Sequence, residues 1–160
     1  MRKGAPKKRE LIGDNKFSNI EIGRFINYVM RKGKKTIAER VVYDALDIVQ
    51  DRLKQDPIVV FDQAVKNVSP LIEVKSRRVG GANYQIPSPV IGGRKFFLAA
   101  RWLINAAKVR KGKPMREKLA EELMDAFSGV GGAVKKKQDV HKMADANKAF
   151  AHFLRYGKKK

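Results

Sequence analysis

Lysine and arginine side chains carry the most evident chemistry in this sequence. There are 36 Lys and Arg against 16 Asp and Glu, a formal net charge of +20 on 160 residues. A net charge of about 2–8 is enough to keep a small domain in solution, so the excess calls for a polyanion to balance it. Ammonium and guanidinium groups bind phosphate oxygens, and the composition therefore favours nucleic acid over an acidic membrane surface.

The basic residues gather in internal runs and at both ends of the chain. The internal runs are residues 32–35, 75–78, 94–95, 108–118 and 135–137. Most of them coincide with predicted turns, helix ends or a hairpin, where long side chains can reach phosphates while the helices stay packed. Any single run is compatible with a solvated surface, but together, at +20, they indicate a bound polyanion.

The residue types that perform catalysis or hold metals are scarce. Cysteine is absent, and the two histidines, His141 and His152, would lie about 16 Å apart along one helix. No Gly-x-x-x-x-Gly-Lys-Ser/Thr sequence is present, which excludes a P-loop, and Gly129–Gly132 is interpreted as a flexible loop. We therefore expect no enzyme, no cofactor and no metal site.

Apolar residues recur at helical spacing over most of the chain and predict a mainly α fold. Six helices are expected, at residues 18–30, 34–55, 57–68, 94–108, 114–127 and 139–156. Ser18 and Glu21 have the spacing of a capping box at the start of the first helix. A stripe that begins at Ile37 predicts the buried side of the second helix. The helix from residue 94 is apolar on most sides, so we expect it at the centre.

Between the third and fourth helices, residues 71–91 predict a protruding two-stranded β-hairpin. Strand-type residues flank Gly80–Asn83, which has the composition of a tight turn. Strand alternation places Lys75 and Arg77 on one face, and Tyr84 beside the turn could stack on an unpaired base. An isolated ribbon is marginal in water, so the hairpin is expected to lean on another part of the structure.

The apolar residues are spread along the chain, which predicts a single domain. We expect a flexible basic N-terminal arm over residues 1–16, a helical RNA-binding domain over 17–156 and a basic tail over 157–160. No apolar segment follows the N-terminal basic run as in a signal peptide. The longest apolar stretch, residues 96–109, is too short and too charged to span a bilayer. Without cysteine, a cytoplasmic setting fits best.

Several ordered blocks of the sequence resemble small-subunit ribosomal protein seven of the bacterial type. They are Phe25–Met30 with Gly33–Lys35, Ala38-Glu39, Val42–Leu46, Asn67–Pro70, Val74–Gly81, Tyr84–Pro87, Arg101-Trp102, Val134–Lys137, Asp139–Ala144 and Ala146–His152. The resemblance covers nearly the whole chain. It implies six helices with the hairpin, and a structural protein of the small ribosomal subunit in the cytoplasm. Residues 88–97 depart from it, because they are less basic and more apolar than the family pattern.

The resemblance also implies partners. Members are primary binders that organise the 3′ major domain of the ribosomal RNA, which forms the head, and they lie near the tRNA exit site beside other proteins of head and platform. Residues implied to face ribosomal RNA are Arg2, Lys3, Lys7, Lys8, Arg9, Lys34, Lys35, Lys75, Arg77, Arg78, Arg94, Lys95, Lys108, Arg110, Lys111, Lys113 and Arg116. Those implied nearest exit-site tRNA are Gly80, Gly81, Ala82, Asn83, Tyr84, Lys148, His152 and Tyr156.

Three alternatives stay open at this point. Many bacterial members bind their own messenger RNA as translational repressors, and the residues do not decide whether this chain does. Composition alone also allows a DNA-binding architectural protein, although no recognition helix is evident and the cations are scattered over many faces. An RNA-modifying enzyme would need a catalytic set of residues, and none is evident.

Overall fold

The computed structural model describes residues 12–79 and 81–157, and most of them are helical. The elements are α1 (Ile20–Val29), α2 (Lys35–Leu53), α3 (Pro57–Val68), β1 (Ile72–Val79), β2 (Ala82–Pro89), α4 (Gly93–Val109), α5 (Met115–Phe127), α6 (Gly132–Ala146) and a 3₁₀ helix, η1 (Lys148–Gly157). The strands pair antiparallel as a hairpin between α3 and α4. The predicted fold of six α-helices and one hairpin is therefore confirmed.

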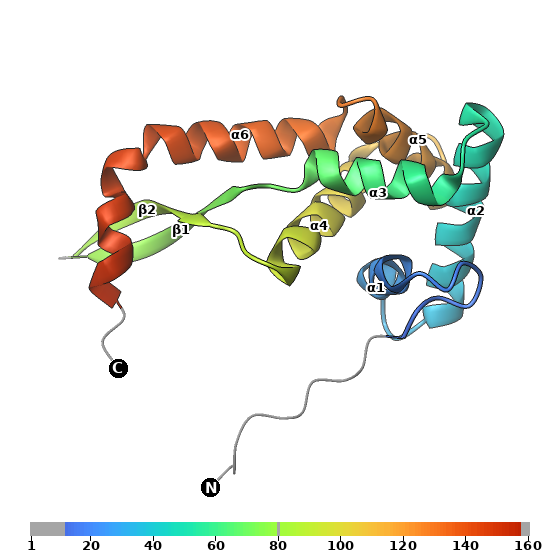
Figure 1. Cartoon of the computed structure of the whole chain (residues 1–160), viewed down its shortest axis with the longest axis horizontal. Helices are drawn as coiled ribbons and strands as arrows, with labels where there is room; N and C mark the ends of the chain where they lie inside the picture. Colours follow the sequence, from blue (N-terminus) through green and yellow to red (C-terminus); the bar gives the residue numbers. More distant parts are fainter. Residues whose placement is uncertain (1–11, 80, 158–160) are drawn as a thin grey trace, which may run out of the picture.

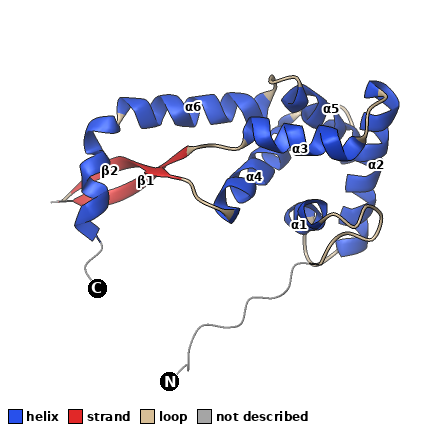
Figure 2. Ribbon diagram, viewed as in Figure 1, coloured by secondary structure: helices blue, strands red, loops and turns tan. Residues whose placement is uncertain are grey.

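The elements form two parts, and both parts can be followed in Figures 1 and 2. Helices α1–α5 gather at one end, and we call them the helical body. The hairpin, α6 and η1 reach away from it, and we call them the extension. Within the extension α6 runs along the ribbon and contacts β1, and η1 turns across the far end of the hairpin against β2 (Figure 1). The hairpin thus leans on α6 and η1, as its marginal stability alone predicts.

The core of the helical body is made of aliphatic and aromatic side chains from all five helices. Phe25 of α1 and Phe61 of α3 pack edge to face, with ring centroids 5.3 Å apart. Leu119 and Leu123 of α5 are fully buried because α5 contacts α2, α3 and α4. Helix α4 contacts α1, α3, α5 and α6, which agrees with the central position expected for it.

Helix α1 begins one residue later than the predicted capping box. The cap is Asn19, whose Oδ1 accepts from the N–H groups of Glu21 at 2.8 Å and Ile22 at 3.3 Å. Ser18 lies outside the helix with φ of 52°, so the prediction of Ser18 as the cap is wrong. The cause is Asp14, whose carboxylate accepts the N–H of Asn19 at 2.9 Å and fixes the preceding loop.

Residues 12–16, expected at the end of the basic arm, pack against the helical body. Asp14 is buried, and it also accepts from the Tyr43 hydroxyl of α2 at 3.2 Å. Lys16 Nζ lies 2.6 Å from Asp47 Oδ1 of α2. A Cβ at Gly23 would come within 2.9 Å of the Ile12 carbonyl oxygen, so this close approach requires glycine. The rest of the expected arm and residues 158–160 of the tail lie outside the described residues.

The last predicted helix starts and ends at the wrong residues. Helix α6 begins at Gly132, not near Asp139, and at Asn147 the chain passes into η1. The early start depends on a residue distant in sequence: Glu122 of α5 accepts the N–H of Ala133 at 2.8 Å. The loop expected at Gly129–Gly132 therefore stops short of Gly132.

Three further sequence predictions concern the start of α3, the buried side of α2 and the possibility of a membrane span. Asp56 caps α3 through the Ile58 N–H at 2.9 Å with Pro57 as the first residue, as predicted. Ile37 was expected inward on α2 but is 55% exposed, because it lines a surface cavity described below. None of the helices in the described ranges is long and apolar enough to cross a lipid bilayer.

Candidate nucleic-acid interface

Helix α1 with the residue Arg31 just beyond its end, and helix α4, carry cations and aromatic rings on neighbouring surfaces. On α4 the residues stand three, four and seven positions apart, which places them on one stripe of the helix. We call the set the α1/α4 face, and its members are Arg24, Tyr28, Arg31, Arg94, Phe97, Arg101 and Lys108. The two helices contact each other, so the two short rows form a single surface.

Aromatic rings hold the guanidinium groups of this face in place. The Tyr28 ring lies against Phe97, with centroids 5.5 Å apart. The guanidinium of Arg94 lies 4.9 Å from the centroid of Phe97, and that of Arg101 lies 5.9 Å from it. Arg24 lies 4.6 Å from the centroid of Phe96. Such cation–π contacts orient a charge without neutralising it. They also account for the apolar character of residues 88–97, because these rings anchor α4 to α1.

The cations of this face repel one another. Burial lowers the pKa of the Lys108 ammonium, and the nearby charges of Arg31 and Arg101 lower it further. Of the five cations, only Arg94 pairs with a carboxylate among the described residues. A bound phosphate would relieve this repulsion, whereas the folded chain alone gains nothing from it.

The base of the hairpin is clamped to α4 by a carboxylate. Glu73 of β1 accepts from Arg94 Nε at 3.2 Å and Nη2 at 3.1 Å, and it pairs with Lys75 Nζ at 2.9 Å. Burial alone would raise the pKa of Glu73, but hydrogen bonds from Lys75 and Arg94 outweigh it and lower the pKa. These two predicted RNA-binding cations therefore share one buried carboxylate and together present a net charge of +1.

At the far end of the hairpin, the predicted residues lie close to η1. Arg77 pairs in register with Tyr84 and Arg78 with Asn83, and both arginines are exposed. The Tyr84 ring is half-buried, with its centroid 5.2 Å from that of Phe150 in η1. The Tyr84 ring therefore packs η1 against the hairpin. The sequence had suggested an RNA base as its stacking partner.

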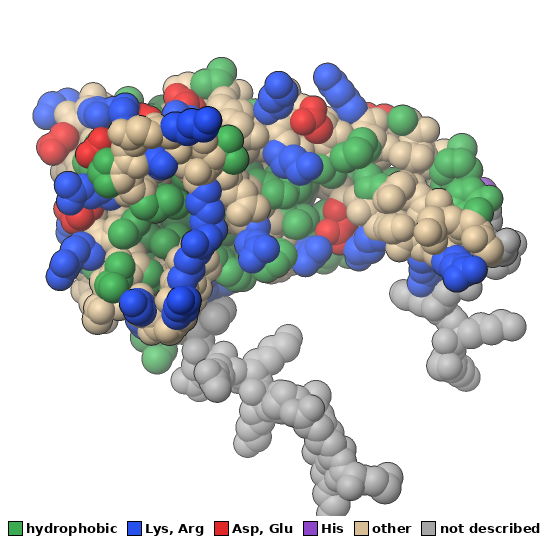
Figure 3. All heavy atoms as spheres, turned by 180° about the vertical axis from the view of Figure 1, so that it is seen from behind, with side chains coloured by type: hydrophobic (Ala, Val, Ile, Leu, Met, Phe, Trp, Pro, Cys, Tyr) green, Lys and Arg blue, Asp and Glu red, His purple; other side chains and the backbone are tan. Residues whose placement is uncertain are grey.

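Basic side chains also cover the opposite side of the molecule from that of Figure 1. In Figure 3, Lys and Arg form a column where the helical body meets the extension, and others continue along the extension. Acidic side chains are fewer in this view and lie at the outer edge of the body and at a few places along the extension. The molecule therefore offers cations over much of its length, as a ligand with an extended phosphate backbone requires.

The sequence is similar to those of known proteins. A family model described as ribosomal protein S7p/S5e matches residues 1–148. The chain belongs to this family. The small ribosomal subunit protein uS7 of Pelotomaculum thermopropionicum is 55% identical over 152 residues, 95% of this chain and 97% of the relative. The uS7 proteins of Teredinibacter turnerae (55% over 146 residues, 91% and 94%) and Thermotoga maritima (50% over 153 residues, 96% and 99%) are similar to it as well.

Membership of the S7p/S5e family confirms the resemblance seen in the sequence. It is a family of structural ribosomal proteins, so the prediction that the chain is not an enzyme is confirmed too. Among the residues described, no group of three or more His, Asp and Glu could hold a metal ion. His141 instead has a structural role, since its Nε2 accepts the Leu71 N–H at 3.2 Å and joins α6 to the start of β1.

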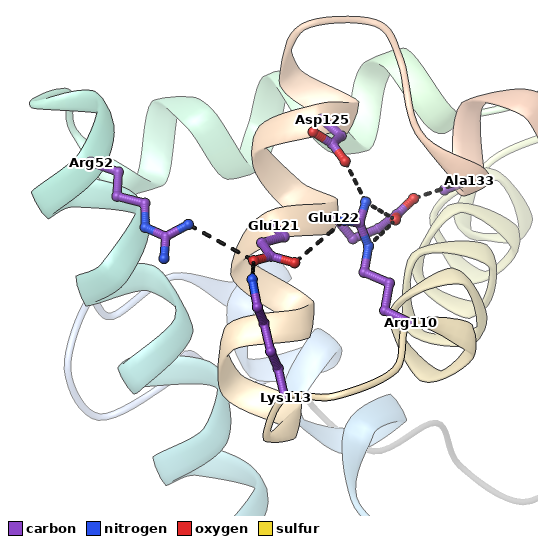
Figure 4. Close-up of polar contacts among 7 residues, drawn as sticks. All are labelled: Arg52, Arg110, Lys113, Glu121, Glu122, Asp125 and Ala133. Carbon is purple, nitrogen blue, oxygen red and sulfur yellow. Dashed lines mark hydrogen bonds and ion pairs between the residues drawn. The ribbon is translucent and has the colours of Figure 1, made fainter.

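Part of the linker before α5, where this S7p/S5e chain was expected to bind RNA, is engaged with its own carboxylates (Figure 4). The Arg110 guanidinium donates to Glu122 through Nη2 at 2.7 Å and to Asp125. Burial would lower the pKa of Arg110, but hydrogen bonds to Asp125 and Glu122 raise it. Lys113 pairs with Glu121, whose pKa this hydrogen bond lowers. Arg110 and Lys113 thus hold α5 and the linker together.

The other predicted residues have varied surroundings. Lys34, Lys111 and Lys148 are exposed, Lys95 is half-buried, and Gly81, Ala82 and Asn83 are exposed at the hairpin tip. Lys35 lies 3.9 Å from Glu39, Arg116 lies 3.4 Å from Asp44, and His152 Nδ1 lies 2.7 Å from the Ala149 carbonyl oxygen. Arg2, Lys3, Lys7, Lys8, Arg9, Gly80 and the side chain of Tyr156 lie outside the described part.

Sequence reasoning missed three cations of the α1/α4 face. Arg24, Arg31 and Arg101 were not singled out as RNA-binding because the prediction was built on runs of consecutive basic residues. A usable signal was nevertheless present. Arg24 and Tyr28 stand four residues apart, which places a cation and a ring on one side of α1, and Arg31 follows three residues later, just beyond the end of that helix.

Proposed function

We propose that this chain is a structural constituent of the small ribosomal subunit, within the cytoplasmic ribosome, that binds and organises the 3′ major domain of the ribosomal RNA. One observation carries the RNA-binding part. Five cations converge on the α1/α4 face, and only one of them is paired with a described carboxylate. Membership of the S7p/S5e family supports a ribosomal RNA as the polyanion.

The proposed mechanism is electrostatic and architectural. Lys and Arg neutralise phosphates that an RNA junction brings close together, and the released counterions make the affinity depend steeply on salt. The buried helical core fixes the spacing of the cations. Recognition is mainly of shape, because A-form RNA hides its base edges in a deep, narrow groove.

The extension is proposed to contact other components of the small ribosomal subunit. We place the hairpin tip and η1 near exit-site tRNA and the proteins of head and platform. In support, these segments lie at the opposite end of the molecule from the helical body (Figure 1) and expose Arg77, Arg78 and Lys148. Repression through its own messenger RNA stays a prediction, and an RNA that imitates the ribosomal site would meet the same cations.

The deciding experiment is binding of the full chain to a transcript of the 3′ major domain across a salt series. Unrelated RNA of equal length and duplex DNA serve as competitors. We expect tight binding that survives an excess of both competitors. Equal binding to all three polyanions, lost together as salt rises, would overturn the proposal and leave only a nonspecific polycation.

A further inference from the structure

A surface cavity of about 300 Å³ opens between the end of α1, the start of α2 and the end of α4. We call it the α1–α2 pocket, and its lining residues fall into two groups. Val29, Ile37, Ala38, Val41, Ile104 and Met115 are apolar. Arg31, Lys34 and Lys108 are cationic. Because Arg31 and Lys108 also belong to the α1/α4 face, the pocket is continuous with the candidate RNA interface.

The apolar group includes a side chain that the fold does not bury. Ile37 is 55% exposed, while the adjacent Ala38 and the facing Ile104 are 4% and 2% exposed. A branched aliphatic residue left open beside a buried floor loses the free energy that burial would provide. A ligand with an apolar surface would cover it.

The cationic group has no internal counterpart. Arg31, Lys34 and Lys108 form no ion pair with a described Asp or Glu, and the pKa of Lys108 is lowered by burial and by the charges of Arg31 and Arg101. Arg31 and Lys34 come from the α1–α2 turn, and Lys108 comes from the end of α4. An anion beside the apolar floor would remove their repulsion.

The size and polarity of the pocket restrict its occupant. A volume near 300 Å³ is at the lower end for ligand sites, so neither an RNA helix nor a protein helix can enter. A single nucleotide turned out of its stack presents an apolar base face with a phosphate on each side. An acidic peptide side chain would match only one of the three cations.

We propose that one unpaired nucleotide of the bound RNA lies in the α1–α2 pocket, its base against the apolar floor and its flanking phosphates on Arg31, Lys34 and Lys108. The inference rests on the proposed function, since it requires that the α1/α4 face meets RNA. It adds contact with a single base to recognition that is otherwise based on shape, and therefore adds sequence or structure preference at one position of the RNA.

Charge placed at the mouth of the pocket tests the inference. Ile37→Glu puts a carboxylate where the base would lie, and Val59→Glu is the matched control, because Val59 is 58% exposed on α3 and the change in charge is the same. We expect Ile37→Glu to bind the 3′ major domain transcript roughly tenfold more weakly than Val59→Glu, as for loss of one base contact. Thermal unfolding of both variants should match, since both sites are exposed.

The outcomes separate the pocket from the proposed function. If the unchanged chain shows no preference for the transcript, the proposed function itself fails. If the unchanged chain binds tightly and Ile37→Glu binds as well as Val59→Glu, the function stands and the pocket inference is overturned.

A photo-cross-link identifies the occupant directly. Ile37 is replaced by benzoylphenylalanine, the protein is assembled with the transcript and its neighbouring ribosomal proteins, and the products are mapped by reverse transcription. We expect one dominant stop, at an unpaired nucleotide. Stops scattered over paired regions, no cross-link at all, or a cross-link to a neighbouring protein would each overturn the inference.

Discussion

Arg101 stands on the exposed side of α4 with its guanidinium beside the Phe97 ring and no carboxylate partner among the described residues. Such an arginine is held in place before any ligand arrives, so less conformational entropy is lost when it binds a phosphate. Arg110, which follows the last residue of the same helix, shows the contrast, since its guanidinium is occupied by Glu122 and Asp125. Neighbouring contacts, more than position in a basic run, decide which cations remain available.

Arg101→Gln should therefore weaken binding to the 3′ major domain transcript and reduce the slope of log affinity against log salt by about one. The measurement is a salt titration of binding. Arg52→Gln is the matched control, because Arg52 is half-exposed and lies 4.0 Å from Glu121 on another side of the body. An unchanged slope for Arg101→Gln would remove Arg101 from the interface.

Glu122 has the opposite role to the free cations, because it ties three elements together. Its carboxylate is 1% exposed, accepts from Arg110 after α4 and accepts the Ala133 N–H that opens α6. Figure 4 shows these bonds converging on α5. A Cβ at Gly131, with φ of 97°, would lie 3.1 Å from Glu122 Oε1, so the turn into α6 also requires glycine.

Glu122→Ala should lower the free energy of unfolding by about 2 kcal/mol, because Arg110 keeps Asp125 as a partner while the Ala133 N–H loses its acceptor. Urea denaturation measures the loss. Glu117→Ala on the same helix is the control and should cost about 0.5 kcal/mol or less. Equal effects of the two substitutions would contradict the anchoring role.

Among the elements, the hairpin depends on contacts beyond its own strands. Its base is fixed to α4 through Glu73, its start to α6 through His141, and its far end to η1 through the Tyr84 ring. Each contact joins residues far apart in sequence. The ribbon is therefore ordered by the elements around it more than by its own ladder.

The Glu73 clamp makes the stability of this region depend on pH. The folded-state pKa of Glu73 lies below its ordinary value of 4.5, so the ionised carboxylate stabilises the fold above that value and loses this contribution as pH falls through the lowered pKa. The free energy of unfolding of the wild type should exceed that of Glu73→Gln by about 1–2 kcal/mol near pH 6, and this difference should shrink toward about pH 3. Urea denaturation of both proteins over this range is the measurement. A difference that does not vary with pH would contradict the clamp.

Loss of the Tyr84 ring should loosen η1 and leave the helical body unchanged. An aromatic pair contributes about 1 kcal/mol, so amide hydrogens of residues 148–157 should exchange roughly fivefold faster in Tyr84→Ala. Hydrogen exchange followed by mass spectrometry measures this. Tyr84→Phe keeps the ring and should behave as the wild type. Equally slow exchange in Tyr84→Ala would show that other contacts hold η1.

How far the sequence predicts these elements depends on the range of the interactions involved. Local signals worked: Asp56-Pro57 marked the start of α3, and the Gly-rich turn marked the hairpin. The starts of α1 and α6 were misplaced because Asp14 and Glu122 act across loops and between helices. No periodicity within a helix reveals such a contact.

At the scale of the whole molecule, the fold was predictable from the helical patterns, but the shape of the interface was not. The sequence identified basic runs. Which cations face away from carboxylates depends on how α1 meets α4 and how the linker folds back on α5. Arg31 and Arg101 lie 70 residues apart, and only packing places both near Lys108.

Under the proposed function, the length of the molecule implies that RNA is contacted at more than one place. The helical body and the extension present cations at both ends (Figure 3), and contacts made by two linked parts of one chain reinforce each other. A transcript that satisfies only one end should therefore bind less tightly than one that reaches both.

Charge reversal at the hairpin tests this at the scale of the assembly. Arg77→Glu with Arg78→Glu should reduce incorporation into particles reconstituted from ribosomal RNA and proteins, with the thermal unfolding midpoint nearly unchanged because both residues are exposed. Arg40→Glu with Lys66→Glu, two exposed residues of the helical body, is the charge-matched control. Normal incorporation of the hairpin variant would place RNA contact elsewhere.

The bond between Leu71 and His141 spans 70 residues, and this separation matters while the chain is being synthesised. At about 5–20 residues per second, several seconds pass between the emergence of the ribbon and that of the helix beneath it. During this interval both strand edges are open to other nascent chains. Exposed Lys75, Arg77 and Arg78 oppose such pairing by charge repulsion. We therefore expect the same cations that are proposed to bind RNA to protect the unfinished protein from aggregation.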